Sequence, residues 1–182
     1  MVNIDMLKNS VRTEGFNCGI PITFVELGDG DASTKIEDLV GQIYRLATSS
    51  RWVCIRFGSS EYPVGTGTLI RGLAQCQLKV EVCCDGSWPA PGWIKSAERW
   101  CIDYLPDTVF DLGSLRPQDM VRFKLGLAIQ LPFIESSFKE LKTFPGLRYI
   151  RCEVDPELWL EGLSLISRFD RARLYPYSEG QF

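Results

Sequence analysis

Hydrophobic and polar residues follow two periodicities along this chain, one typical of strands and one typical of helices. Residues 78–84 (LKVEVCC) alternate with a period of two, which predicts a half-buried strand. Residues 34–48 carry apolar side chains at helical spacing, which predicts an amphipathic helix whose apolar face is Ile36, Leu39, Val40, Ile43, Tyr44 and Ala47. Segments of these two kinds alternate along the chain. This order predicts βαβ units, a mainly parallel sheet and the α/β fold class.

The same criteria predict the other elements. We expect strands at residues 21–27, 51–57, 78–84, 100–105, 120–128, 147–153 and 171–175. We expect helices at residues 34–48, 64–76, 133–142 and 156–168. Ser33 is expected to cap the first helix and Asp155 the last, and residues 10–21 indicate a glycine-rich loop. No linker or repeat interrupts the chain, so residues 1–182 are predicted to form a single α/β domain with about six mainly parallel strands.

The chain contains no histidine, which narrows the chemistry open to it. A Ser-His-Asp triad, a Cys-His dyad and a His-ligated zinc are excluded within one chain. The net charge of −3, without any long Lys/Arg run, argues against nucleic-acid binding. No apolar run approaches the roughly 18 residues of a membrane span, and no signal peptide is evident. We therefore expect a cytoplasmic protein with no membrane and no nucleic-acid partner.

The seven cysteines do not follow a recognisable metal or disulfide pattern. Their odd number argues against a disulfide framework. No Cys-x2-Cys spacing occurs, and the adjacent pair Cys83 and Cys84 is poorly placed to chelate one metal, so no metal site is predicted. Cys54 and Cys152 lie in apolar stretches and are expected to be buried as small hydrophobic residues.

The residues that follow each parallel strand are the candidates for a binding site, because ligands collect at the carboxyl ends of such strands. A Gly-Ser-Ser turn after the second strand offers backbone N–H groups and hydroxyls, and an Asp-Gly turn follows the third. Each of these turns alone is more often a plain connection. The candidate binding residues of these two turns are Gly58, Ser59, Ser60, Glu61, Cys84, Asp85, Gly86 and Ser87.

Three stretches, taken in order, resemble a known family. Residues 10–27 (SVRTEGFNCGIPITFVEL), 58–63 (GSSEYP) and 81–87 (EVCCDGS) resemble the corresponding stretches of 7-carboxy-7-deazaguanine synthase, a radical S-adenosylmethionine enzyme of queuosine biosynthesis. Residues 58–63 stand where that family has a Gly-Gly-Glu-Pro segment that holds the methionine end of the cofactor. The resemblance implies a partial (incomplete) TIM-like barrel with outer helices, a dimer, and S-adenosylmethionine as a candidate ligand.

The departures from the family pattern concern its chemistry. The family carries Cys-x3-Cys-x2-Cys after its first strand, and the thiolates of these residues hold an iron–sulfur cluster. Here residues 28–33 read GDGDAS and contain no cysteine, so an iron–sulfur cluster is not expected. Glu26 stands in place of the family's arginine, and Tyr175-Pro176-Tyr177 occupies the region where the family has a histidine. The resemblance adds the carboxylates Glu14 and Glu26 to the candidate ligand-binding residues, although a solvated or paired carboxylate is the more frequent role for such a residue.

Two classes of function follow from these residues. The first is a catalytically degenerate member of the family that binds a purine-like or nucleotide-like molecule, forms a homodimer, or pairs with a related chain. The second is an enzyme of deazapurine or nucleotide metabolism that applies non-radical chemistry in the same pocket. An active radical enzyme with unusually placed cluster cysteines is a third and weaker alternative. Trp88 and Trp93, in a Pro/Gly-rich loop, are the aromatic residues that we expect at an interface rather than in the core.

Overall fold

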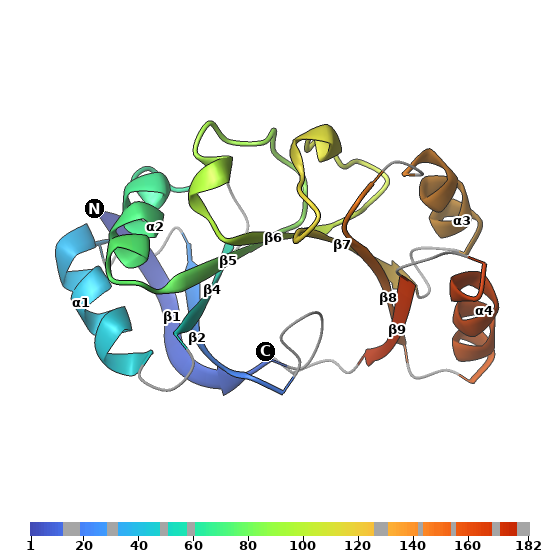
Figure 1. Cartoon of the computed structure of the whole chain (residues 1–182), viewed down its shortest axis with the longest axis horizontal. Helices are drawn as coiled ribbons and strands as arrows, with labels where there is room; N and C mark the ends of the chain where they lie inside the picture. The colour runs from blue at the N-terminus through green and yellow to red at the C-terminus, as the bar shows by residue number, and fades with distance from the viewer. Residues whose placement is uncertain are drawn as a thin grey trace. The chain divides into compact units, whose positions relative to one another are not determined.

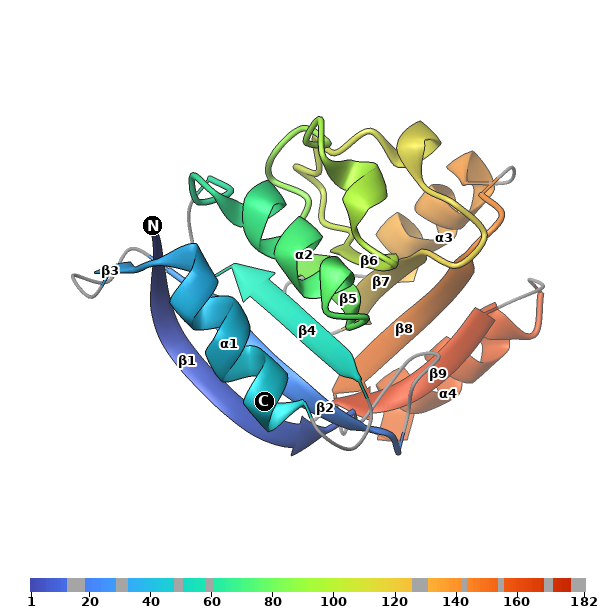
Figure 2. The same ribbon diagram turned by 60° about the vertical axis from the view of Figure 1, so that its left-hand side comes forward.

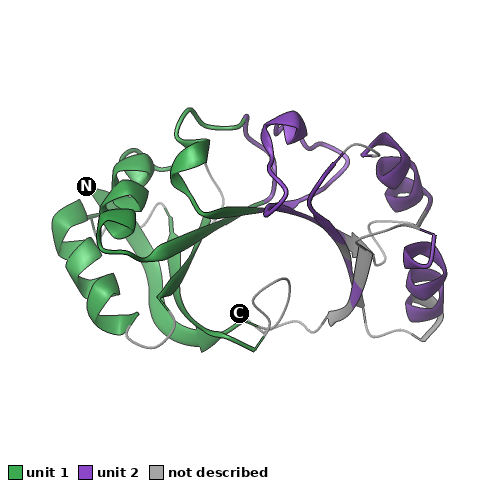
Figure 3. Cartoon of the chain, in the orientation of Figure 1, with its two compact units in different colours: residues 1–84, 90–100 green, residues 85–89, 101–182 purple. Residues whose placement is uncertain are grey.

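The structure is a computed structural model that describes residues 1–12, 19–28, 33–47, 51–57, 61–125, 131–141, 144–153, 156–168 and 172–177. These residues form two compact units, which Figure 3 distinguishes by colour. Unit 1 contains residues 1–84 and 90–100, and unit 2 contains residues 85–89 and 101–182. The single domain predicted over residues 1–182 stays a prediction.

Unit 1 is a sheet covered on one face by two helices (Figures 1 and 2). Its strands lie in the order β3-β1-β2-β4-β5. Strands β2, β4 and β5 are parallel, whereas β1 runs antiparallel to both β2 and β3. The elements are β1 (Val2–Val11), β2 (Pro21–Leu27), β3 (Ser33–Thr34), α1 (Ile36–Leu46), β4 (Trp52–Phe57), α2 (Thr66–Gln75), β5 (Lys79–Cys84) and the short 3-10 helix η2 (Ile94–Ser96).

The covered face of the unit 1 sheet forms its core. Helices α1 and α2 lie side by side across this face in Figure 2. Alternate strand residues point toward them, because side chains of a strand alternate between the two faces. The buried apolar residues of the strands are Val25, Leu27, Val53, Ile55, Val80 and Val82, and the helices contribute Leu39, Ile43, Leu69, Ile70 and Leu73. The remaining alternate residues of β2, β4 and β5 therefore lie on the opposite face.

Strand β6 (Arg99–Asp103) begins in unit 1 and ends in unit 2. In unit 2 it pairs in parallel with β7, β7 with β8, and β8 with β9. Phe123 of β7 packs edge-on against Phe138 of α3, with ring centroids 4.8 Å apart. The elements of unit 2 that follow β6 are the 3-10 helix η3 (Leu112–Ser114), β7 (Met120–Leu125), α3 (Leu131–Glu140), β8 (Leu147–Glu153), α4 (Pro156–Ile166) and β9 (Ala172–Tyr177). In the part of the chain that the structure describes, no helix is long and apolar enough to cross a membrane.

Most predicted elements are confirmed. The four predicted helices appear as α1 to α4, and the predicted strands appear as β2 and β4 to β9, with ends that differ by a few residues. The α/β class and the mostly parallel pairing are also confirmed. The prediction that Asp155 caps α4 lies outside the described residues, but Pro156 does begin that helix.

Two local predictions are wrong. Ser33 does not cap α1, because Ser33 and Thr34 are extended and pair with β1, which leaves Lys35 at the cap position without a side-chain hydrogen bond. Strand β1 was not expected, and its last residues, Ser10 and Val11, fall in the predicted loop. Its side chains are mostly half-buried or exposed and include several poor strand formers, so β1 has no clear hydrophobic alternation. Pairing with β2 makes it a strand.

Helix α2 packs closely on the loop before β6 at Gly67. A Cβ atom built there would lie 2.7 Å from Trp93 Cγ, and the Trp93 ring is held by a stacked contact with Trp100 at 5.4 Å between centroids. We expect Gly67→Ala to lower the free energy of unfolding, because overpacking costs about 1–3 kcal/mol and exceeds the gain in helix propensity of about 1 kcal/mol. Urea denaturation measures the change.

Gly41→Ala in α1 is the matched control for this prediction. A Cβ atom at Gly41 meets only the flexible end of Arg45, at 3.6 Å. This substitution should raise the free energy of unfolding by about 0.5–1 kcal/mol through helix propensity alone. If both variants gain stability, the close approach of α2 to Trp93 is refuted.

Candidate functional site

The unit 1 sheet carries polar side chains on the face turned away from α1 and α2. Cys54 of β4 lies beside Glu81 of β5, and Arg56 lies beside Cys83. Because alternate residues of a strand share one face, these four side chains project from the same side of the sheet. Glu26 of β2 pairs with Arg56 and continues the row. Cys54, Glu81 and Cys83 of this row are buried, so the polar groups are largely shielded from water.

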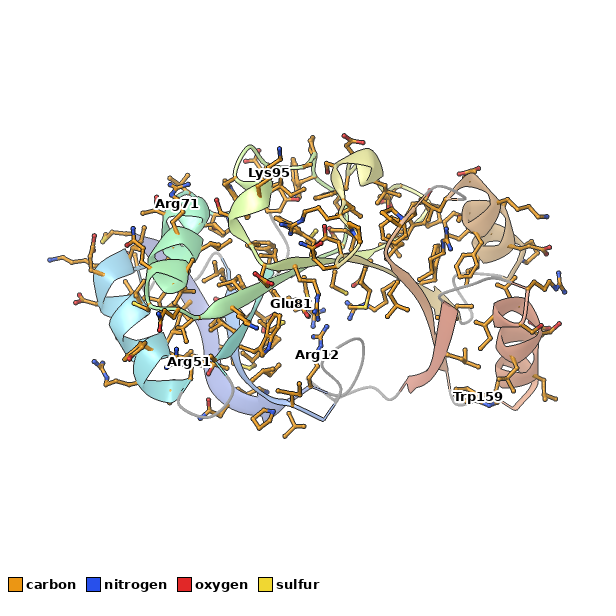
Figure 4. The ribbon with its side chains drawn as sticks, viewed as in Figure 1. Arg12, Arg51, Arg71, Glu81, Lys95 and Trp159 are labelled. Atoms are coloured by element: carbon orange, nitrogen blue, oxygen red, sulfur yellow. The ribbon has the colours of Figure 1, made fainter. Side chains whose placement is uncertain are left out.

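Two arginines, Arg12 and Arg99, converge on the Glu81 carboxylate on this face, and Figure 4 labels Arg12 and Glu81. Arg12 Nη2 lies 2.5 Å from Glu81 Oε1, and Arg99 Nη1 lies 3.6 Å from Glu81 Oε2. The three side chains are at most 12% exposed. When Arg12, Glu81 and Arg99 are all ionised, the three side chains together carry a net charge of +1.

The turn between β1 and β2 holds Arg12 in place. The N–H of Arg12 donates to the Ile20 carbonyl at 2.9 Å, and the Arg12 carbonyl accepts from the N–H of Gly19 at 2.7 Å. Gly19 has a φ of +81°, a conformation that glycine adopts at little cost. The antiparallel pairing of β1 with β2 therefore carries Arg12 to the polar face, where it reaches β5.

Two thiols lie beside the charged cluster. Cys54 Sγ and Cys83 Sγ are 3.6 Å apart, and the Cys83 thiol donates to Glu81 Oε1 at 3.6 Å. Arg12 Nη1 donates to Cys54 Sγ at 3.7 Å. The cluster therefore contains one carboxylate and two thiols, all buried, between two guanidinium groups. We call Arg12, Cys54, Glu81, Cys83 and Arg99 the Glu81 cluster.

Burial changes the acidity of the groups in this cluster. It raises the pKa of Glu81 from 4.5 to about 7, against the opposing effect of Arg12 and Arg99. The pKa of Cys54 is raised well above its ordinary value, first by its hydrogen bond with Cys83 and then by burial. Glu81 is therefore a carboxyl group that exchanges its proton near neutral pH, which is typical of functional sites.

Trp52, the first residue of β4, closes the cluster on one side. The guanidinium of Arg99 lies 5.0 Å from the Trp52 ring centre, and Lys79 Nζ lies 5.5 Å from it. Both distances are within the range of cation–π attraction. Trp52 thus contributes to holding Arg99 beside Glu81.

The structure places only part of the site predicted from the sequence. Glu26 is half-buried on the polar face, and Glu61 is exposed. Cys84, the last residue of β5, is half-buried, with its Sγ 3.9 Å from the Tyr62 hydroxyl. The predicted residues Glu14, Gly58, Ser59 and Ser60 lie outside the described residues. Ligand binding by any of these residues stays a prediction.

The predicted Asp-Gly turn is confirmed. Asp85 Oδ1 accepts a hydrogen bond from the Ser87 N–H at 2.9 Å, and Gly86 has a φ of +74°. The Gly86 carbonyl accepts hydrogen bonds from the N–H groups of Val109 and Phe110, at 2.9 and 3.1 Å. The turn therefore has a structural role in unit 2 in addition to any role in binding.

The two tryptophans expected at an interface differ in their surroundings. Trp88 is 39% exposed and lies outside the core, and its place at an interface stays a prediction. Trp93 instead packs on Trp100 and lies 5.5 Å from the Tyr62 ring centre, because the absence of a side chain at Gly67 lets it approach α2.

Sequence reasoning missed the Glu81 cluster. It did predict that Cys54 is buried, which is confirmed, while the side chain of Cys152 lies outside the described residues. The available signal was Glu81 itself, a charged residue in the centre of the apolar strand KVEVCC. A buried carboxylate requires a partner, but the identity of that partner depends on strand pairing across distant segments.

Comparison with known proteins adds a likeness in fold. No protein-family model and no curated protein matches the sequence. The crystal structure of QueE from Escherichia coli superimposes on it with a TM-score of 0.69, covering 97% of this chain and 94% of that chain at 14% sequence identity. At so low an identity the similarity concerns the fold alone. The chain therefore has a QueE-like α/β fold.

Proposed function

We propose that this chain is a catalytically degenerate relative of 7-carboxy-7-deazaguanine synthase that binds a small molecule or a protein partner and carries no radical chemistry. The proposal includes a partial TIM-like barrel, a cytoplasmic location and a homodimer or a pairing with a related chain. The QueE-like fold supports it together with the three sequence stretches that resemble that family.

One observation carries the proposal. Residues 28–35 connect β2 to α1, and they contain no cysteine. This connection follows the first parallel strand, where the resembled family places its three cluster cysteines. Within the described part of the chain, the group of side chains able to surround a metal contains two cysteines rather than three. A three-cysteine iron–sulfur site therefore has no counterpart among those residues.

Anaerobic reconstitution with iron and sulfide tests the loss of radical chemistry. We expect no stoichiometric iron–sulfur absorption and no reductive cleavage of S-adenosylmethionine, because the ligands of the cluster loop are absent. A cluster of about four irons per chain together with cleavage of S-adenosylmethionine would contradict the proposal.

Thermal shift measurements test ligand binding. S-adenosylmethionine, S-adenosylhomocysteine, pterins and deazapurines are the probes, since each resembles part of what the related family handles. A bound probe at about 100 times its Kd should add about 2.7 kcal/mol to the free energy of unfolding. Glu14→Gln and Ser59→Ala should reduce the shift, whereas Glu37→Gln, an exposed change on α1, should not. If no probe shifts the transition and the protein is a stable dimer by light scattering, the protein-partner form of the proposal holds instead.

The second function, non-radical chemistry in the same pocket, is favoured by one contact. Cys84 lies at the carboxyl end of β5, where parallel sheets bind ligands, and is 3.9 Å from the Tyr62 hydroxyl. A thiol in that place could act as a nucleophile if its thiolate were stabilised. The discriminating result is a Cys84→Ser variant that still binds a probe but loses its turnover.

A further inference from the structure

Cys54, Glu81 and Cys83 bring three metal-binding atoms around one point in the unit 1 sheet. Their sulfur and carboxylate oxygen atoms all lie within 4.8 Å of one another, and all three residues are buried. Cys54 comes from β4. Glu81 and Cys83 are alternate residues of β5, and their side chains lie on the same face of the sheet as that of Cys54. The strands of the sheet fix their positions, so the arrangement belongs to the framework of unit 1 rather than to a loop.

The distances match those of a tetrahedral thiolate site. With Zn–S bonds of about 2.3 Å and a Zn–O bond of about 2.1 Å, two ligating sulfurs lie about 3.8 Å apart, and a sulfur and an oxygen lie about 3.6 Å apart. Here the two sulfurs are 3.6 Å apart, and Cys83 Sγ is 3.6 Å from Glu81 Oε1. Two edges of the tetrahedron are therefore present without movement of the backbone.

The two arginines are compatible with a bound cation. Two thiolates and one carboxylate carry three negative charges, which exceed the two of a zinc ion. When zinc replaces the two thiol protons, the net charge of the Glu81 cluster does not change. Arg12 forms an ion pair with Glu81 and donates a hydrogen bond to Cys54, and ligating groups in metal sites are usually held by such outer contacts.

The space beside Cys54 and Glu81 leaves no room for an organic ligand. The gap lined by Cys54, Glu81 and Arg12 is too narrow even for a molecule the size of water. Small-molecule pockets are about 300–1,000 Å³. Soft thiolate ligands in a tetrahedral arrangement select zinc-type metals rather than magnesium or calcium.

We propose that unit 1 holds one zinc ion through Cys54, Glu81 and Cys83, a site distinct from the cluster loop of the related family and independent of the small-molecule function proposed above. Three protein ligands leave the fourth tetrahedral position to another ligand. The ion would join β4 to β5 within the sheet and so stabilise unit 1.

Metal analysis of the full chain tests this site. The protein is purified with a thiol reductant, incubated with zinc and desalted, and zinc is then measured by mass spectrometry. We expect about one zinc per chain for the wild type, and at least about tenfold less for Cys54→Ser and for Cys83→Ser. Cys84→Ser is the matched control, because Cys84 neighbours Cys83 in β5 but points to the other face of the strand. It should retain the metal.

Cobalt titration provides a readout that does not depend on the variants folding. The wild-type chain should bind about one Co²⁺ and develop thiolate-to-cobalt charge-transfer absorption, which zinc then removes. The proposal is overturned if the reduced wild type retains no zinc and gives no such absorption, or if folded Cys54→Ser and Cys83→Ser bind as much metal as the wild type. A Cys54–Cys83 disulfide that persists in reductant, without metal, would overturn it as well.

Discussion

Replacing Glu81 with alanine is expected to lower the free energy of unfolding by about 3–5 kcal/mol at about pH 8, the cost of breaking a buried ion pair from one side. Glu81 is 4% exposed and is approached by Arg12 at 2.5 Å and by Arg99 at 3.6 Å. Its removal leaves two guanidinium groups without this counter-charge in a region shielded from water. Urea denaturation of chelator-treated protein measures the loss, with the chelator excluding any effect of a bound metal.

A double substitution tests whether the stability lost in Glu81→Ala comes from the unbalanced charge of the arginines or from the loss of packed side-chain atoms. Arg12→Met with Glu81→Met removes the closest pair together and fills the space with apolar side chains, and such exchanges of buried pairs are often neutral. The double variant should therefore be more stable than Glu81→Ala, and the double-mutant cycle through both single methionine variants should give a coupling of at least about 1 kcal/mol. If the effects of Arg12→Met and Glu81→Met on the free energy of unfolding simply add, the ion pair between Arg12 and Glu81 does not stabilise the fold.

Raising the pH from about 5.5 to about 8 is expected to destabilise the protein by about 2 kcal/mol. The cause is Glu81, whose pKa is raised from 4.5 to about 7 in the folded chain. Between these two values the folded state holds a proton that the unfolded state has released, so stability falls as the pH rises. The contribution is fully present below the unfolded pKa of 4.5 and is lost as the pH passes through about 7. Urea midpoints across this range, again with chelator, measure the slope.

The absence of histidine makes this prediction unusually easy to test. In most proteins histidines titrate in the same range and obscure a single carboxyl group, but this chain has none. The glutamine variant Glu81→Gln, which keeps the shape of the side chain but cannot ionise, should show a flat profile between about pH 5.5 and about 8. If its profile keeps the slope of the wild type, Glu81 is not the group responsible.

The helices and the parallel strands were predictable because their signals are local. In α1, apolar residues recur on one face, and Leu39 and Ile43 of that face are fully buried in the structure. Strand β1 was not predictable in this way. Its half-exposed side chains carry no clear alternation, and its conformation depends on pairing with β2, whose residues lie farther along the chain. Ser33 likewise pairs with β1 as part of β3, so it does not lie at the cap position of α1 where the sequence predicted it.

The sequence by itself determined the α/β class, the helices, the burial of Cys54 and the absence of cysteine from residues 28–35. It also restricted proton transfer to groups other than histidine. The tertiary structure decided which charged and thiol groups meet. Arg12, Cys54, Glu81 and Arg99 come from four separate segments, and the parallel register that places Cys54 beside Glu81 brings together residues on different strands. The pairing of β4 with β5 joins two segments that helix α2 separates along the chain, so no local pattern contains it.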